Sequence, residues 1–73
     1  MATKNNFEIT GYDNERLCCR KEIRAYTAGG ALKLYLEQTG RTFLTDRIAE
    51  NREQNLASVV TDRHSFMCRR IRP

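Results

Sequence analysis

The chain has 73 residues, with 13 Lys or Arg against 9 Asp or Glu, which gives a formal net charge of +4. A chain of this length forms one domain, so we expect a single domain over residues 1–73 with a small core. The 40% of apolar and 30% of charged residues are typical of a folded protein and exclude a disordered one. The sequence has no apolar run that could span a membrane and no apolar leader segment, so we expect a cytoplasmic protein.

The positive charge is concentrated near the C-terminus. Nine basic and nine acidic residues precede Arg63, whereas residues 63–73 carry Arg63, Arg69, Arg70 and Arg72 and no acid. Arginine outnumbers lysine by ten to three. Because the guanidinium fork binds carboxylates and phosphates through two donors at once, this set predicts a docking patch. The alternative is a solubilising basic tail.

The N-terminal third predicts a β-hairpin preceded by a loose segment over residues 1–5. Apolar and polar residues alternate over residues 6–12, with Phe7, Ile9 and Gly11 on one side and Glu8, Thr10 and Tyr12 on the other. Such alternation is typical of a half-buried strand. The second strand covers residues 17–26. One face carries Leu17, Cys19, Ile23 and Ala25, interrupted by Lys21, and the other carries Arg20, Glu22, Arg24 and Tyr26. Asp13 and Asn14 between the strands favour a turn.

A helix is predicted over residues 28–39. The Thr27 hydroxyl is placed to accept a free backbone N–H at its start. Ala28, Ala31, Leu32, Tyr35 and Leu36 recur at helical spacing. Gly40 occupies the position where a left-handed residue ends many helices.

Residues 42–51 fit two structures. Phe43, Leu44 and Ile48 are compatible with a third strand, whereas Thr45 is placed to cap a second helix that would run to Leu56. We favour the strand, because a second helix would leave the sheet short. The sequence leaves both alternatives open.

The C-terminal third predicts a second hairpin. Residues 56–61 include the β-branched run Val59-Val60-Thr61, residues 62–65 resemble a turn, and residues 66–71 form the last strand. The expected order is ββαβββ, an α+β fold with one helix packed on one face of an antiparallel sheet.

The reactive side chains do not form a recognisable catalytic or metal-binding motif. Cys18, Cys19 and Cys68 are an odd number of cysteines, which favours reduced thiols. His64 is the only histidine, and neither a Cys–His pair with an orienting group nor a zinc-binding Cys-x-x-Cys is present. We therefore expect no enzyme activity, no metal and no cofactor. One of the adjacent cysteines should fill core space and the other should face solvent.

The glycines before the helix are the remaining candidate for a small-molecule site. The segment Ala28-Gly29-Gly30-Ala31 opens the helix, where free N–H groups can bind phosphate. No P-loop or G-x-G-x-x-G motif accompanies it. We favour the interpretation that small residues let the helix start lie close to the sheet.

The arginines are therefore the candidate partner-binding residues: Arg63, Arg69, Arg70 and Arg72, then Arg20 and Arg24 if the strands that carry them are neighbours. On a strand, Arg70 and Arg72 share one face and Arg69 takes the other. Tyr12 and Tyr26 are the aromatic residues that a nucleic-acid surface could use for stacking, although the sequence has no RRM, KH or cold-shock motif.

The layout resembles a group of small phage and mobile-element proteins. The segment Lys21-Glu22-Ile23-Arg24-Ala25-Tyr26-Thr27 leads into a capped helix with Ala31-Leu32-Lys33-Leu34-Tyr35-Leu36, and the final hairpin ends in Phe66-Met67-Cys68-Arg69-Arg70-Ile71. Over residues 6–72 this arrangement is similar to anti-CRISPR proteins that block type I surveillance complexes. One type I-F inhibitor group has a similar length and order of strands around one helix. The resemblance is one of layout, so it assigns no role to individual residues.

The resemblance implies a stoichiometric inhibitor without a reaction of its own, acting in the cytoplasm of a host bacterium. Such a protein would bind a subunit of the CRISPR-Cas surveillance complex and block target DNA binding or recruitment. The alternative hypothesis is a small basic protein that binds nucleic acid directly or acts as a regulator. Neither hypothesis involves a membrane or a small-molecule substrate.

Overall fold

A computed structural model of the chain describes residues 4–14 and 16–71, without the side chain of Cys18. The predicted α+β class and the ββαβββ order are confirmed, with a short 3₁₀ helix inserted after the main helix. The elements are β1 (Asn5–Asp13), β2 (Arg16–Ala25), α1 (Ala28–Gln38), the 3₁₀ helix η1 (Thr42–Arg47), β3 (Ala49–Asn51), β4 (Leu56–Val60) and β5 (His64–Arg70).

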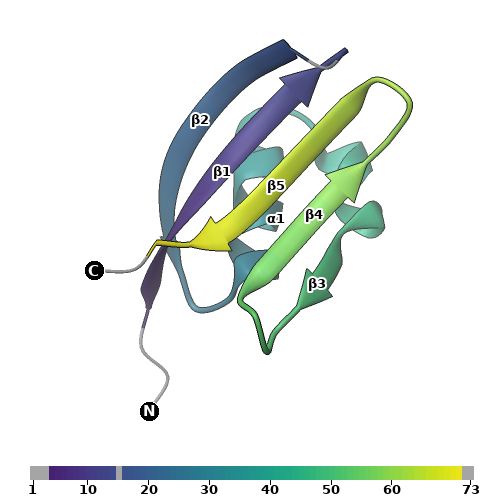
Figure 1. Ribbon diagram of the computed structural model, residues 1–73. Coiled ribbons are helices and arrows are strands. Elements are labelled where there is room, and N and C mark those ends of the chain that lie inside the picture. The colour runs from purple at the N-terminus through teal and green to yellow at the C-terminus, as the bar shows by residue number, and fades with distance from the viewer. Residues whose placement is uncertain (1–3, 15, 72–73) are drawn as a thin grey trace.

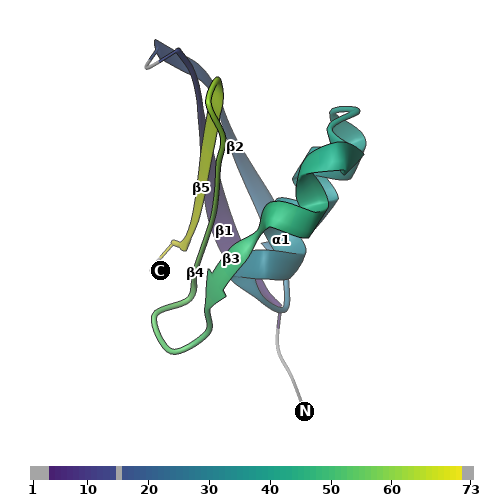
Figure 2. The same ribbon diagram turned by 90° about the vertical axis from the view of Figure 1, so that its right-hand side faces the viewer.

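The five strands form one antiparallel sheet in the order β2-β1-β5-β4-β3. The two predicted hairpins are present, and β5 joins them by pairing with β1. Consequently β5 is the middle strand of the sheet, and β2 and β3 are its edges (Figure 1). Figure 2 shows that α1 and η1 lie on the same side of the sheet. None of the described elements covers the opposite face.

The core lies between α1 and the sheet. The strands contribute their helix-facing residues, and α1 contributes the apolar side that its spacing predicts. The fully or almost fully buried side chains are Phe7, Ile9, Ile23, Ala28, Ala31, Leu32, Tyr35, Leu36, Leu44, Ala57, Val59, Phe66 and Cys68. Each sheet residue in this set alternates with an outward-facing neighbour, as the period of two requires.

A β-bulge divides β2 into two parts. The register steps from the Gly11–Cys19 pair to the Tyr12–Leu17 pair, which leaves Cys18 as the extra residue. An extra residue reverses the side to which the following residues point. Leu17 therefore lies on the same side as Tyr12, and the prediction that it shares a face with Cys19 and Ile23 was wrong.

The predicted ends of α1 are confirmed. The Thr27 Oγ1 atom accepts a hydrogen bond from the Gly30 backbone N–H at 2.9 Å. At the other end Gly40 has φ of +75°, which glycine adopts without steric cost. The Arg41 N–H donates to Leu36 O at 2.7 Å and the Gly40 N–H to Glu37 O at 3.3 Å, which together form a Schellman motif.

Residues 42–51 match neither predicted alternative in full. Thr42–Arg47 forms the 3₁₀ helix and only Ala49–Asn51 forms a strand. Leu44 is buried against the core from the 3₁₀ helix, and the Thr45 hydroxyl donates to Thr42 O at 2.7 Å within the helix rather than capping a later one. A tight helical turn places Leu44 in the core while leaving room for a short edge strand.

Several other boundaries differ from the predictions by one or two residues. Asn5 already belongs to β1, so the segment expected to be loose is shorter than residues 1–5, and residues 1–3 lie outside the described part of the chain. The last strand begins at His64, two residues before the predicted start, because His64 pairs with Asp13. Neither α1 nor η1 is long and apolar enough to cross a membrane.

Candidate binding face

The side of the sheet opposite α1 is called here the open face. Residues that are directly opposite each other in an antiparallel pair point to the same side, so the register defines this face completely for the described strands. Its members are Asn6, Glu8, Thr10, Tyr12, Leu17, Arg20, Glu22, Arg24, Ala49, Asn51, Leu56, Ser58, Val60, Ser65, Met67 and Arg69.

An apolar group runs across the open face. Tyr12 pairs with Leu17 on one side and with Ser65 on the other, and Ser65 pairs with Val60. Met67 lies in the next row of the middle strand. The exposed fractions of the four large apolar side chains are 40% for Tyr12, 54% for Leu17, 70% for Val60 and 54% for Met67. Apolar residues that are scattered singly over a surface need no explanation, but a contiguous group marks an interaction site.

Charged side chains lie beside the apolar group, on β2, β1 and β5. Glu8 pairs with Glu22 on one side and with Arg69 on the other. The Arg69 Nη2 atom lies 3.5 Å from the Glu8 Oε1 atom, so these two side chains attract each other. The carboxylates of Glu8 and Glu22 are directly opposite each other and repel. Arg20 and Arg24 flank Glu22 along β2 and are exposed. The face therefore has an apolar part bordered by charges of both signs.

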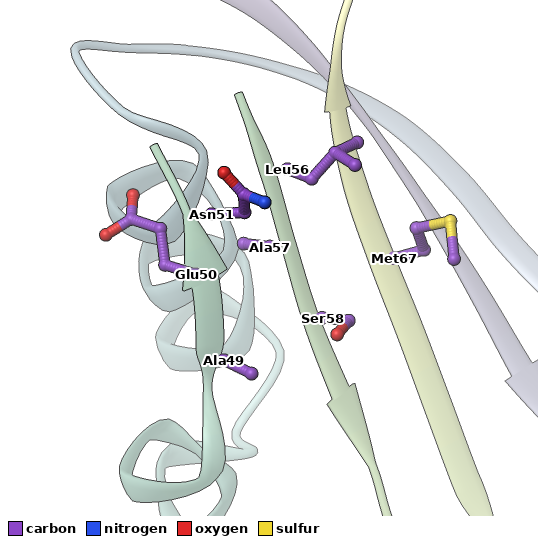
Figure 3. Close-up of a pocket in the computed structure, with 7 residues that line it drawn as sticks. All are labelled: Ala49, Glu50, Asn51, Leu56, Ala57, Ser58 and Met67. Carbon is purple, nitrogen blue, oxygen red and sulfur yellow. The ribbon is translucent and has the colours of Figure 1, made fainter. Parts of the chain in front are cut away.

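A shallow hollow of about 280 Å³ lies over β3, β4 and β5. Figure 3 shows Ala49 and Asn51 on β3, Leu56 and Ser58 on β4, Met67 on β5, and the Glu50 side chain pointing away from them. Its volume lies just below the range of roughly 300–1,000 Å³ that is typical of small-molecule sites. A hollow of this size and apolar lining fits a side chain of a partner protein.

The structure separates the predicted arginines. Arg69 shares the open face with Arg20 and Arg24, but β1 lies between their strands, so β2 and β5 are not neighbours. Arg70 pairs with Phe7 and so lies on the helix side, where it is exposed.

Arg63 does not join this group. Arg63 lies in the turn before β5, at the opposite end of that strand from Arg69, which is about 20 Å at strand geometry. Arg72 lies outside the described residues. The six candidate residues therefore do not form one patch.

Cys68 and His64 are not brought together as a reactive pair. His64 and Cys68 lie on the same side of β5 with Phe66 between them. The His64 Nδ1 atom is 3.9 Å from the Asp13 Oδ1 atom, and Cys68 is fully buried. Burial first, and the negative charge of Glu50 second, raise the pKa of the Cys68 thiol to about 12. Among the described residues, no three His, Cys, Asp or Glu side chains cluster as they would around a metal ion.

Cys19 is half-buried under α1, and its Sγ atom lies 2.7 Å from the Tyr35 hydroxyl oxygen. This agrees with the expectation that one of the adjacent cysteines fills core space. The other part of that prediction concerns Cys18, whose side chain lies outside the described part of the structure.

The start of α1 already holds a carboxylate. The Gly29 N–H donates to the Glu50 Oε2 atom at 2.8 Å, and the Gly30 N–H donates to Thr27. A Cβ atom on Gly29 would lie 2.7 Å from the Glu50 carboxyl carbon. The two glycines therefore admit close neighbours, in agreement with the favoured interpretation, and a side chain of the protein occupies the position that a phosphate would take.

The sequence does not single out several members of the open face. It identifies Met67, Val60 and Leu56 only as parts of strands, and it does not indicate the hollow beside β3. The alternation in residues 64–70 does indicate that Met67 is exposed, because Met67 falls between the core residues Phe66 and Cys68. The position of Leu17 depends on the bulge, for which the sequence has no comparable signal.

Comparison of the chain with protein-family models, with curated proteins and with solved structures finds no match. The interpretation of the open face therefore depends on its own geometry and chemistry.

Proposed function

We propose that the protein is a non-catalytic inhibitor that binds another protein through the open face of its sheet. The observation that supports this is the group of exposed apolar side chains Tyr12, Leu17, Val60 and Met67, which lie on four neighbouring strands of a face that no other described element covers. The partner that the layout of the chain suggests is a subunit of a type I CRISPR-Cas surveillance complex, with binding of target DNA or recruitment as the step that is blocked.

The composition of the open face favours a protein partner. Interface centres are enriched in aromatic residues, Met and Arg and depleted in Lys. The described part of this face carries Tyr12, Met67 and three arginines, and none of its strand residues is a lysine. The hollow beside Leu56 offers a place for an anchoring side chain, which is where binding energy concentrates in such interfaces.

The test uses a purified type I-F surveillance complex and measures its binding to target DNA as the protein is added. We expect the wild-type protein to reduce DNA binding at a one-to-one ratio. Met67→Glu places a charge in the centre of the open face and should weaken the inhibitor at least about tenfold, since truncation of a hot-spot residue near the centre of an interface costs about 2 kcal/mol or more. Circular dichroism checks that the variant is folded.

Three further variants locate the contact. Arg69→Glu and Arg70→Glu make the same change at adjacent residues on opposite sides of the sheet, so an open-face contact predicts that Arg69→Glu has the larger effect. Lys33→Glu, on the exposed side of α1, should inhibit as the wild type does. Loss of inhibition in Arg70→Glu with full inhibition in Met67→Glu would show instead that the C-terminal arginines make the contact. Absence of inhibition by the wild-type protein would reject this partner.

A second candidate function is direct binding of nucleic acid. The observation in its favour is that Tyr12, Arg20 and Arg69 share the open face, since single strands stack on aromatic rings beside basic groups. This function predicts a gel shift with naked DNA or RNA whose affinity falls steeply with salt. Binding to the surveillance complex without a gel shift on naked nucleic acid would favour the protein partner.

A further inference from the structure

We propose that the free edge of β2 binds an extended acidic segment of a partner protein as an additional strand of the sheet. This goes beyond the function proposed for the open face, because it uses the backbone of an edge strand and does not need the Met67 group.

The two edges of the sheet differ. β3 has three residues, all exposed, and Glu50 within it is tied to the start of α1. β2 has ten residues and is the outermost strand on the other side, and none of the described elements lies beyond it (Figure 1). The bulge at Cys18 interrupts its first part, so the regular pairing with β1 runs over residues 19–25. An edge strand presents a row of backbone donors and acceptors on which an extended peptide can add by main-chain hydrogen bonds.

The charges along this edge are nearly all positive. Arg20 and Arg24 project on the open face, and Lys21, which pairs with Ile9, projects on the helix side. All three are exposed, and Glu22 is the single acid among the described residues of β2. An added strand would place its side chains opposite these, where unlike charges stabilise the pair and like charges destabilise it.

The same charges disfavour a second copy of this chain. If two β2 strands paired with Glu22 opposite Glu22, Arg20 of each copy would face Arg24 of the other. The partner that fits this edge is therefore an acidic strand, with acids opposite Arg24, Lys21 and Arg20.

The first test uses the synthetic peptide Thr-Glu-Val-Lys-Glu-Glu-Val-Thr, which in antiparallel alignment places its three glutamates opposite those three residues and its lysine opposite Glu22. Titration into isotopically labelled protein at millimolar peptide should shift the backbone amides of residues 19–25 and slow their hydrogen exchange. The charge-reversed peptide Thr-Lys-Val-Glu-Lys-Lys-Val-Thr should cause neither change. Absence of shifts in β2 with the acidic peptide would overturn the proposal.

Backbone pairing is tested with two N-methylated forms of the acidic peptide, one methylated at its odd and one at its even residues. Alternate residues of an added strand direct their amides toward its neighbour, so one methylated form should lose binding and the other should keep it. Equal binding by both forms would show that the main chain makes no contact, which would overturn strand addition.

Two variants of the protein complete the test. Lys21→Glu should weaken peptide binding about fivefold, as expected for the loss of one cross-strand ion pair, and Lys33→Glu on α1 should not change it. The unliganded protein should sediment as a monomer, and a dimer formed through β2 would overturn the assignment of an acidic partner. Lys21 lies outside the open face. Failure of the peptide to bind β2 would therefore not bear on the inhibition test with Met67→Glu, and failure of that inhibition test would not bear on peptide binding.

Discussion

Gly11 is the residue that lets three larger side chains meet beneath α1. A Cβ atom there would lie 2.6 Å from the Cys19 Sγ atom and 2.7 Å from the Phe66 ring. Tyr35 closes the group from α1, with its ring centroid 5.9 Å from that of Phe66 and its hydroxyl in contact with Cys19. A glycine in the middle of a strand destabilises that strand. Gly11 is explained by the close packing of Cys19 and Phe66 that it permits.

Cys68 should make stability fall at alkaline pH. Its pKa rises from the usual 9.0 to about 12 in the folded protein, so above pH 9 the unfolded chain loses the thiol proton while the folded chain keeps it. The free energy of unfolding should therefore decrease between pH 9 and 12, by at most about 1.4 kcal/mol per pH unit from this group. Below pH 9 both states keep the proton and the contribution is constant.

The matched variant is Cys68→Ala, which removes the thiol and leaves a small cavity. Urea unfolding from pH 8 to 10.5 should show the wild type more stable at pH 8 and the difference narrowing as pH rises above 9. A difference that stays constant over this range would contradict the assignment. A second measurement tests the burial of the thiol. Mass mapping after brief alkylation at pH 8 should find Cys68 unmodified in the folded protein.

At the scale of elements, Glu50 connects the short strand β3 to α1. Its carboxylate accepts the Gly29 N–H at 2.8 Å and lies 3.4 Å from the Arg52 Nε atom. An acidic group at a helix start satisfies a free donor and interacts favourably with the helix dipole. This contact explains how three exposed residues persist as an edge strand.

Glu50→Ala should lower the free energy of unfolding by about 1 kcal/mol, which is typical for loss of a helix-capping group. Glu53→Ala, an exposed acid in the adjacent turn, removes the same charge without the contact and should change stability by less than about 0.5 kcal/mol. Urea unfolding at neutral pH measures both variants. Equal effects of the two changes would show that charge alone, and not the hydrogen bond to Gly29, is responsible.

The elements that could be predicted from the sequence are those specified by residues close together in the chain. The alternation in β1 and the capping residues Thr27 and Gly40 specify a strand and a helix within a few positions, and the structure agrees with them. The 3₁₀ helix spans fewer than two α-helical turns and buries only Leu44, so no period is long enough to identify it. The bulge at Cys18 changes the side of Leu17 without altering the composition of β2.

At the scale of the whole molecule, the strand order decides which side chains meet, and no local signal encodes it. β5 is last in sequence but lies in the middle of the sheet, with β1 and β4 on its two sides. For this reason the arginines that are close in sequence are divided between two faces and two ends of β5. The open face that results combines residues from all five strands, and only its alternation within each strand could be recognised beforehand.

The same order predicts how stability is distributed. Backbone amides in β1 and β5 should exchange most slowly with solvent, at rates set by global unfolding, because each of these strands is paired on both sides and contributes fully buried residues such as Ile9 and Phe66. β3 should exchange fastest, since it is an edge strand of only three residues, all of them exposed. Hydrogen exchange followed residue by residue measures this order, and amides of β3 as slow as those of β5 would contradict it. With Tyr12 on β1 and Met67 on β5, the centre of the open face would then lie on the most rigid strands of the sheet, which lowers the entropic cost of binding a partner there.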